Sequence, residues 1–412
     1  MLLTLISILL QLISVPIGLY YLFIGFCGFL PRSSKRKRIK NKTHSFAVVA
    51  AAHNEEAVIG ELLRSLRALD YDDYDIFIIA DNCTDNTAEL ARKSGAIVLE
   101  RYSRSKRGKG YALEWFFEKL FAMKKHYDYV AVFDADNLAA PDFLRRMNES
   151  ANMGHKVVQG FLDSKNPYDS WITASYSYCF WCINRIFQLA RYNIGLCCEL
   201  SGTGFVIETE LLRRLGWGAH CLTEDMEFTM KSMYDGEKIA FNYDARVYDE
   251  KPLTLMQSWR QRVRWMRGHC DVASRFFLPL VKKGILTRSL SCIDCAVYLV
   301  QPIRIIAMGI ILFFAYAQSF YPAGDLGFVQ LWYIFKSPLM WNIISIFQLL
   351  YMPFLVVYER RELTLKMVLY FALYPVYNLT WIPIALWGLL THKKKDWAHT
   401  KHTRAVSIEE VA

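Results

Sequence analysis

Two acidic motifs hold the carboxylates that metal binding and proton transfer require. Asp134-Ala-Asp136 follows a short apolar run, so alternate residues at a strand end could turn both carboxylates toward one ligand. A hard divalent cation such as Mg²⁺ or Mn²⁺ prefers such oxygen donors and typically also binds phosphate oxygens. Thr223-Glu224-Asp225 could supply a general base that takes the proton of an attacking hydroxyl. Alone, Asp-x-Asp is common in solvated turns, so this interpretation depends on the neighbouring motifs.

A basic and aromatic motif, Gln261-Arg262-Val263-Arg264-Trp265, lies further along the chain. Arginine pairs bidentately with phosphate oxygens, and an indole face stacks on the C–H groups of a sugar or on a cation. The motif could therefore bind a departing diphosphate and an acceptor ring. The alternative for Trp265 is an anchor at a membrane surface, where tryptophan is enriched.

Two further loops carry charge beside predicted strands. Asp81 ends an apolar run, and the residues after it could cap a helix, but capping does not explain why acidic residues gather at the same sheet edge as Asp134. Lys109-Gly110 follows Lys106 and Arg107, so it offers a point charge for phosphate next to a residue that permits close backbone approach. A solvated charged loop is the alternative for this second segment.

Strands that alternate with helices must position these motifs. The apolar runs predict strands over residues 46–52, 75–80, 96–99 and 129–133. The amphipathic stretches between them predict helices over residues 56–68, 86–94 and 111–124. This alternation favours a mainly parallel α/β sheet wrapped by helices. Ligands bind at the carboxyl ends of the strands in such sheets, which is where the polar clusters 53–56, 81–85 and 134–136 fall.

The N-terminal run of residues 2–30 is apolar and uncharged, longer than the roughly 20 residues that a membrane span requires. It lacks a preceding basic region and a clear cleavage site, so we expect a retained transmembrane helix. The basic stretch 32–42 places the following domain in the cytosol and the N-terminus outside. The net charge of +10 then indicates attraction to an anionic leaflet. No nucleic-acid partner is expected.

The C-terminal third predicts three further spans, over residues 290–317, 331–357 and 367–391. Before them, residues 258–280 are amphipathic and rich in arginine, which is typical of a helix lying in the membrane interface, although a helix docked on the soluble core has the same pattern. Three crossings would leave the tail outside, whereas its basic start at residues 392–395 favours the cytosol. Either the run containing Pro375 is re-entrant or the tail breaks the positive-inside rule.

The ten cysteines include two Cys-x-x-Cys spacings, at Cys179/Cys182 and Cys292/Cys295. Zinc sites usually combine two such pairs in one small polar module. Here one pair lies in an aromatic stretch and the other opens an apolar run, so we expect buried thiols in a reducing cytosol.

In chain order the motifs are Asn54-Glu55-Glu56, Asp81-x-x-x-Asp85, Lys109-Gly110, Asp134-x-Asp136, Gly202-Thr203-Gly204, Thr223-Glu224-Asp225 and Gln261-x-x-Arg264-Trp265. This series resembles the inverting family 2 glycosyltransferases, in particular the membrane-integrated synthases of cellulose, hyaluronan, chitin oligomers and poly-N-acetylglucosamine. The resemblance covers roughly residues 45–270. The segment 199–205 departs from the Phe-Phe-Cys-Gly-Ser type of cellulose synthases, which leaves the sugar and the linkage open.

The resemblance implies a GT-A catalytic fold over residues 31–285, between a transmembrane helix over 1–30 and a transmembrane region over 286–392, with a basic tail over 393–412. It implies Mg²⁺ or Mn²⁺ bound by Asp134 and Asp136. The implied catalytic residues are Asp225 as base, Glu224 and Arg264. The implied acceptor-binding residues are Trp265, Gly202 and Thr203. The implied donor-binding residues are Ala51, Asn54, Glu55, Asp81 as the uracil reader, Lys109, Asp134, Gln261 and Arg264.

The function that this resemblance favours is a processive, inverting transfer of sugar from a UDP-sugar to a growing β-linked polysaccharide. UDP-glucose is weakly favoured over UDP-N-acetylglucosamine, and the polymer would be secreted through the protein's own spans in the plasma membrane. The alternative is a non-processive lipid glycosyltransferase with a ceramide or diacylglycerol acceptor. A catalytically inactive binding subunit would be expected to lack the acidic residues that are present here.

Overall fold

The structure, a computed structural model, describes residues 2–31, 42–318, 320, 350–394 and 404–411. At its centre is an eight-stranded sheet with the order β3-β2-β1-β4-β7-β6-β8-β5. The strands are β1 Phe46–Ala52, β2 Tyr74–Asp81, β3 Ile97–Arg101, β4 Tyr129–Asp134, β5 Leu138–Ala139, β6 Val157–Ser164, β7 Phe205–Glu208 and β8 Ile239–Asp249.

The first half of the sheet confirms the predicted strands. β3, β2, β1 and β4 are mutually parallel, and each covers its predicted run to within two residues at either end. The second half was not predicted, and it mixes directions: β7 is antiparallel to β4 and β6, while β6 and β8 are parallel. β6 is buried along its whole length, so it lacks the alternating pattern that reveals a half-exposed strand.

The two faces of the sheet form two hydrophobic cores, because successive side chains of each strand point to opposite sides. Val49, Ile79 and Val132 belong to one cluster, and Val48, Ile78 and Ala131 to the other. Helices α2 Ile59–Arg67 and α5 Phe143–Asn152 contribute to the second cluster. Helices α4 Lys109–Phe121, α8 Thr209–Leu215 and α9 Glu224–Asp235 contribute to the first. The predicted helix over 86–94 is present as α3 Thr87–Lys93.

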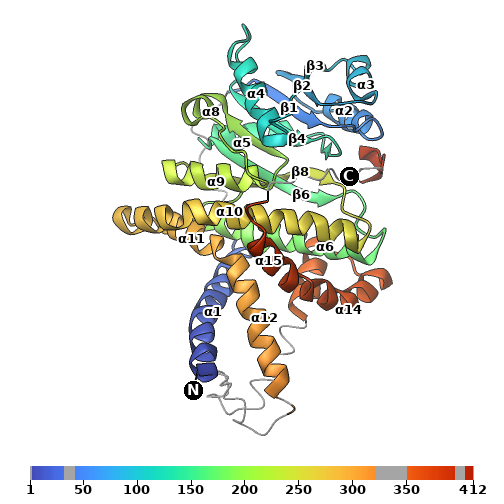
Figure 1. Ribbon diagram of the computed structural model, residues 1–412. Coiled ribbons are helices and arrows are strands. Elements are labelled where there is room, and N and C mark those ends of the chain that lie inside the picture. Colours follow the sequence, from blue (N-terminus) through green and yellow to red (C-terminus); the bar gives the residue numbers. More distant parts are fainter. Residues whose placement is uncertain (1, 32–41, 319, 321–349, 395–403, 412) are drawn as a thin grey trace.

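A helical layer separates the sheet from the apolar helices (Figure 1). It consists of α6 Trp171–Cys182, the π-helix η1 Ile183–Leu189, α7 Ala190–Asn193, α10 Leu255–Thr287 and α11 Leu290–Leu299. The predicted amphipathic segment 258–280 lies within α10, which packs against α9, α11 and α15. Near its end α10 exposes Leu278, Ile285 and Leu286 beside a lysine pair, so one helix both docks on the protein and presents an apolar edge.

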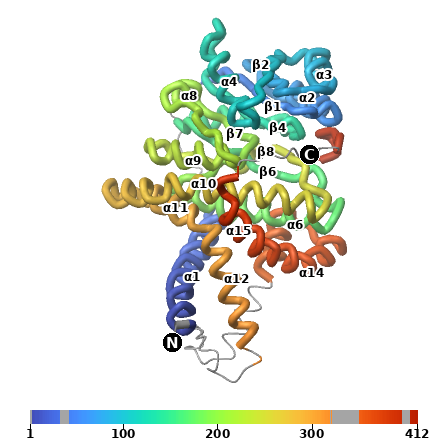
Figure 2. The backbone as a smooth tube through the Cα atoms, in the orientation of Figure 1, coloured from blue at the N-terminus to red at the C-terminus, as the bar shows by residue number. Residues whose placement is uncertain are grey.

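Within the described residues, three helical segments are long and apolar enough to cross a membrane: Leu3–Cys27, Gln301–Gln318 and Leu365–Leu390. The first two belong to α1 Leu2–Cys27 and α12 Gln301–Gln318, which descend side by side from the helical layer (Figures 1 and 2). The third is broken at Thr380 into α14 Leu365–Leu379 and α15 Trp381–Leu390. In Figure 1, α14 runs crosswise to α1 and α12, against α6.

Of the predicted C-terminal spans, one is divided in the structure and one lies mostly outside the described residues. The predicted span over 290–317 is divided in the structure: the chain turns at Val300, and the candidate span is α12 alone, Gln301–Gln318, after the shorter α11. Pro302 lies in the first turn of α12, where its missing N–H costs no helical hydrogen bond. The predicted span over 331–357 lies outside the described residues up to position 349, and residues 350–360 are helical. The basic stretch 32–41 also lies outside the described residues.

The C-terminal segment 404–411 returns to the sheet (Figure 1). Its short helix η3, Ile408–Glu410, lies beside β5 and β8, where Ile408 packs with Leu138, Ala140 and Tyr248. The end of the chain therefore lies on the sheet-bearing side of the helical layer, whereas the N-terminus lies at the far end of α1.

Candidate active site

Three of the predicted motifs converge on the ammonium group of Lys109. Lys109 forms an ion pair with Asp134 at the end of β4 and donates a hydrogen bond to the Gly202 carbonyl oxygen at 2.5 Å. Gly110 lets the start of α4 approach the start of α9, because a Cβ there would lie 2.3 Å from the Ala219 carbonyl oxygen and 3.3 Å from Glu224 Cβ. Burial lowers the pKa of Lys109, but the charges of Asp134, Glu224 and Asp225 outweigh that effect, so the start of α9 also acts on this ammonium group.

The two acids at the start of α9 lie near the positive charges of Lys109 and Arg264, and the pKa of each acid is raised. Burial and the charge of Asp225 raise the pKa of Glu224 to about 7, while Lys109 and Arg264 oppose the increase. Burial also raises the pKa of Asp225, against the Met226 N–H and the positive charges of Lys109 and Arg264. Asp225 Oδ1 accepts the Met226 N–H at 2.8 Å, and its other oxygen lies 3.4 Å from where a Cβ at Gly202 would be. A carboxylate with a raised pKa beside the Gly202 segment is suited to proton transfer.

The Asp134-x-Asp136 loop has one accessible carboxylate and one buried carboxylate. The Asp134 side chain is 39% exposed and carries the Lys109 ion pair. Asp136 is buried, and its Oδ2 accepts the Glu250 N–H at 3.2 Å. In the described residues, no three His, Cys, Asp or Glu side chains gather as a metal ligand set. A cation such as Mg²⁺ or Mn²⁺ uses one or two carboxylates and completes its shell with phosphate and water, so the accessible carboxylate of Asp134 fits such an ion.

Asp249 is a third acid near this loop that sequence reasoning missed. It ends β8, and its pKa is raised by burial and by the charges of Asp136 and Asp134, while Lys251 opposes the increase. Lys251 Nζ lies 2.6 Å from Asp249 Oδ1. The criterion applied to Asp134, an acid at the end of a strand, would also have found Asp249 if β8 had been predicted.

Asp81 lies at a different place on the sheet edge from Lys109. It stands opposite Arg101 in the β2–β3 register, and Arg101 Nη1 lies 2.5 Å from Asp81 Oδ1. Lys109 pairs with Asp134 instead, so the two predicted donor-binding residues Asp81 and Lys109 do not pair with each other. Burial raises the pKa of Asp81 despite the neighbouring guanidinium. Arg101 was not singled out from the sequence.

The predicted donor-binding residues of the first loop differ in their surroundings. Ala51 lies directly beside Asp134 in the β1–β4 register. Asn54, with a φ of 56°, accepts the Thr84 N–H at 2.8 Å, and the Glu55 N–H donates to Thr87 Oγ1 at 2.9 Å. These bonds tie the loop after β1 to the loop after β2. Ala51 is therefore next to the acidic site, whereas Asn54 and Glu55 also hold two loops together.

The Gly202-Thr203 segment is fixed by two amides that the sequence did not single out. Gln159 on β6 accepts the Ser201 N–H at 2.9 Å and donates to the Thr203 carbonyl oxygen at 2.9 Å. Thr203 Oγ1 accepts the Asp134 N–H at 3.0 Å and donates to Asn137. The predicted acceptor segment is thus bonded directly to the acidic loop.

The α10 motif divides between two sides of the helix. Arg264 donates to the Leu222 carbonyl oxygen at 3.0 Å and influences both acids of α9. Trp265 packs against Tyr176 and Phe180 of α6, with ring centroids 5.9 and 6.4 Å apart. The hypothesis that Arg262 joins the diphosphate site does not fit its position. Arg262 is 0% exposed and faces α14–α15, where it donates to Thr380 Oγ1 at 2.8 Å.

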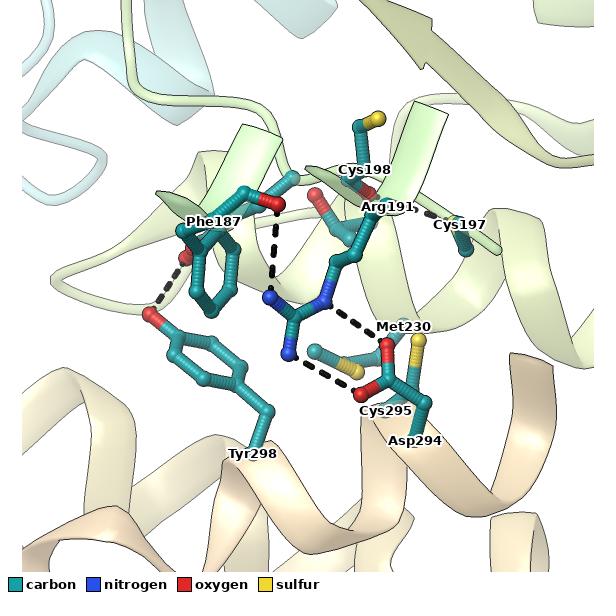
Figure 3. Close-up of a pocket in the computed structure, with 10 residues that line it drawn as sticks. Phe187, Arg191, Cys197, Cys198, Met230, Asp294, Cys295 and Tyr298 are labelled. Carbon is teal, nitrogen blue, oxygen red and sulfur yellow. Dashed lines mark hydrogen bonds and ion pairs between the residues drawn. The ribbon is translucent and has the colours of Figure 1, made fainter. Parts of the chain in front are cut away.

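A buried polar network fastens the site to the apolar helices (Figure 3). Arg191 forms two hydrogen bonds with Asp294 of α11, at 2.8 and 2.9 Å, and donates to the Phe187 carbonyl oxygen. Tyr20 of α1 donates to the same aspartate at 2.8 Å. Beside them, Tyr298 donates to Glu199, whose pKa burial raises to about 8. α1 and α11 are thereby joined to the segment that precedes Gly202.

The four cysteines of the two Cys-x-x-Cys pairs differ in burial, because Cys179 is half-buried and the other three are buried. All ten cysteines are free, and Cys182, Cys292 and Cys295 are buried. Neither Cys-x-x-Cys pair belongs to a metal ligand set within the described ranges.

Comparison with solved structures supports the fold assignment. The chain is similar to the mannosyltransferase PcManGT from Pyrobaculum calidifontis, solved in complex with GDP-Man and Mn²⁺. The TM-score is 0.62 at 17% sequence identity, covering 95% of this chain and 100% of that one. At this identity the likeness concerns the fold, a GT-A arrangement with a mixed sheet.

The curated relatives include a diacylglycerol glucosyltransferase and a polysaccharide synthase. The chain is 29% identical to the beta-monoglucosyldiacylglycerol synthase of Nostoc sp. over 271 residues, covering 62% of this chain and 55% of that protein. It is 27% identical to the poly-beta-1,6-N-acetyl-D-glucosamine synthase of Staphylococcus epidermidis over 274 residues, covering 64% of each. The chain thus spans less than two thirds of the length of either relative.

The family model described as "Glycosyltransferase like family 2" matches residues 44–268, which include every motif from Asn54 to Trp265. More than half of the chain lies in this match, and the matched region contains the sheet, the acidic site and the first part of α10. The chain is therefore a member of the family 2 glycosyltransferases and an enzyme of that class.

Proposed function

We propose that this enzyme transfers glucose from UDP-glucose, with inversion, to the growing end of a β-linked polysaccharide and passes the product into the membrane region. Asp225 is the base in this proposal, and Glu224, Lys109 and Arg264 set the charge around it. Asp81 and Lys109 hold the donor together with Ala51, Asn54, Glu55, Asp134 and Gln261. UDP-N-acetylglucosamine is the competing donor.

The transfer is a single displacement. The acceptor hydroxyl oxygen forms a bond to the anomeric carbon while the bond from that carbon to the diphosphate oxygen breaks. The hydroxyl proton passes to the Asp225 carboxylate, and UDP leaves. Attack opposite the leaving group converts an α-linked donor into a β-linkage. The guanidinium of Arg264 offsets the charge that grows on the leaving diphosphate.

Asp134 and Asp136 would hold a Mg²⁺ or Mn²⁺ ion, which when bound supplies a positive charge to the diphosphate. Lys109 occupies the accessible carboxylate of Asp134 in the structure, so it balances that charge until a cation and the donor arrive. Asp136 keeps its hydrogen bond from Glu250 and so fixes the loop.

The observation that favours a sugar polymer is the combination of aromatic rings and buried polar atoms where α6, α10 and α14 pack against one another, a contact that we call the seam. Tyr176 is the centre of this seam, with its ring 5.9 Å from Trp265 and 5.6 Å from Tyr377. On the α10 side, the buried atoms Ser258 Oγ, Gln261 Oε1 and Arg262 Nε have no hydrogen-bond partner among the described residues. Each such buried group costs about 1–3 kcal/mol if left unsatisfied.

An acyl chain in this seam would leave those polar atoms unsatisfied. A glycan offers hydroxyl groups at its ring edges and C–H faces for the aromatic rings, so it suits both parts of the lining. The seam begins at Trp265, which is the predicted acceptor-binding residue. A polymer extended at Asp225 would therefore leave along this path toward the apolar helices.

The membrane arrangement that fits this proposal has an even number of crossings after α10. α1 and α12 descend together, and the C-terminal segment packs on the sheet, so α14 and α15 would lie in the interface on the catalytic side (Figure 2). The run containing Pro375 is then re-entrant or interfacial, the catalytic domain and the tail are cytosolic, and the N-terminus is outside. The exposed Leu278, Ile285 and Leu286 of α10 would contact the bilayer.

A lipid acceptor is the second candidate, and the likeness to the Nostoc diacylglycerol enzyme favours it. Purified protein should be incubated with labelled UDP-glucose or UDP-N-acetylglucosamine, with or without diacylglycerol. Label in an ethanol-insoluble product that a β-glycosidase digests would support the polymer. Label only in the organic extract, or products of one added sugar, would refute processive synthesis.

A matched pair of variants on α10 tests the seam. Arg262→Met removes the buried guanidinium, whereas Arg260→Met makes the same change at an exposed position two residues earlier. We expect Arg262→Met to shorten the polymer while UDP release continues, and Arg260→Met to leave product length unchanged. Equal product lengths for wild type and Arg262→Met would show that the polymer does not pass this residue.

A further inference from the structure

The C-terminal segment 404–411 contacts the part of the catalytic domain that carries the acidic loop. Arg404 donates its backbone N–H to Glu250 Oε2 at 3.2 Å, and its guanidinium lies 3.4 Å from Asp169. The Glu250 N–H in turn donates to Asp136 Oδ2 at 3.2 Å. One glutamate therefore connects the tail to the buried carboxylate of the Asp-x-Asp loop.

Lys165 makes a second connection between the same two segments. This buried lysine donates to the Asp136 carbonyl oxygen at 2.7 Å and to the Arg404 carbonyl oxygen at 3.2 Å. A buried ammonium group is stable only when its N–H groups have partners, so loss of the tail carbonyl would leave it less satisfied. The Lys165 side chain thus holds the main chain at Asp136 and the main chain at Arg404 together.

A small hydrophobic cluster anchors the tail at this position. Ile408 is 5% exposed and packs with Leu138, Ala140 and Tyr248, with Val411 beside them. Leu138 lies in β5, which begins two residues after Asp136 and is the last strand of the sheet. Burial of a side chain such as isoleucine contributes about 1.5–3 kcal/mol, which adds to the polar contacts of Arg404 in holding the segment at this position.

We infer that residues 404–411 are a positioning element of the donor site, which holds the Asp134–Asp136 loop in the conformation that binds the metal–nucleotide complex. This inference rests on the proposed assignment of that loop to the donor. The tail touches no substrate in this role. It acts through Lys165 and Glu250 on Asp136, in the way that outer partners orient metal ligands.

The test compares two single substitutions in the full-length enzyme. Ile408→Asp places a carboxylate in the hydrophobic cluster, and Ala405→Asp places the same group at an exposed position of the same segment. We expect Ile408→Asp to weaken Mn²⁺-dependent UDP binding about 10–100-fold, the range typical for loss of an outer metal-site partner. KM for the donor should rise similarly while kcat changes little. Ala405→Asp should bind like wild type.

A double-variant comparison shows whether the effect passes through Lys165. Lys165→Met removes the bridging ammonium group, and it should lower UDP binding less in the Ile408→Asp background than in the wild-type background, because the bond from Lys165 to the Arg404 carbonyl oxygen is already broken there. Wild-type UDP binding by Ile408→Asp would overturn the inference. A fall in kcat and thermal stability with unchanged UDP and Mn²⁺ binding would also overturn it.

The same measurements separate this inference from the proposed function. Sugar transfer and Mn²⁺-dependent UDP binding by the wild-type enzyme test the donor site itself. If both are present and Ile408→Asp has no effect, the tail has no positioning role and the donor site stands. If wild-type protein binds no UDP with Mn²⁺, the donor-site assignment fails.

Discussion

α10 and the start of α9 approach each other so closely at Gly268 that a side chain does not fit there. Gly268 is buried on α10, and a Cβ there would lie 2.4 Å from Thr223 Oγ1, 2.6 Å from Thr223 Cγ2 and 2.9 Å from Thr223 Cβ. All three distances are below the closest approach that real Cβ atoms make. Gly268→Ala must therefore push α10 and the residues beginning at Thr223 apart.

Two costs follow from this displacement. Overpacking of a well-packed contact typically destabilises a protein by about 1–3 kcal/mol. Asp225 lies two residues after Thr223, and proton transfer to its carboxylate depends on the distance from the acceptor hydroxyl. A shift of about 1 Å in such a geometry lowers a rate about 100-fold. We expect Gly268→Ala to fold with reduced thermal stability and to release UDP about 100-fold more slowly.

A second-site change should restore part of the activity. Thr223→Ala removes Oγ1 and Cγ2, the two atoms closest to the new methyl group, and the Thr223 side chain makes no capping hydrogen bond to α9. Initial rates of UDP release and melting temperatures in detergent should be measured for both single variants and the double variant. Gly60→Ala on α2, where nothing lies within 4 Å of the added Cβ, is the control. Wild-type rates for Gly268→Ala, or no gain in the double variant, would refute the reasoning.

Three further predictions concern the charged groups. Asp225→Asn should lower sugar transfer about 10²–10⁴-fold, the usual contribution of a general base, while UDP binding by equilibrium dialysis survives; unchanged turnover would remove Asp225 from the mechanism. Burial and the charge of Asp225 raise the pKa of Glu224 to about 7, so Glu224→Gln should remove a step near pH 7 from the pH–rate profile while Asp225 still ionises. A profile identical to that of wild type would show that the ionisation of Glu224 does not affect the rate. Asp294→Asn leaves Arg191 buried without its carboxylate, so thermal denaturation should show a loss of about 3–5 kcal/mol, and a loss below about 1 kcal/mol would mean that the pair is not structurally important.

Local patterns in the sequence were sufficient to predict the first half of the sheet and to find the motifs along the chain. β1, β2 and β4 are apolar runs that end in polar residues, and this local pattern is enough to predict strands whose carboxyl ends meet. The resemblance of the motif series, and not this local pattern, implied a common site for Asp134, Gly202 and Asp225. In the structure Lys109 contacts Asp134 and Gly202, and Asp225 lies beside Gly202. The amphipathic pattern of α10 was equally visible.

Pairs of side chains that are far apart in the sequence became known only from the folded arrangement. Arg101 pairs with Asp81 because of the β2–β3 register. Arg262 donates to Thr380 because α14–α15 packs on that side of α10. The docking of Ile408 beside β5 was equally unpredictable, since a two-residue strand and a short tail carry no periodic signal. Local patterns record which residues are buried, whereas pairing depends on distances that exist only after the chain has folded.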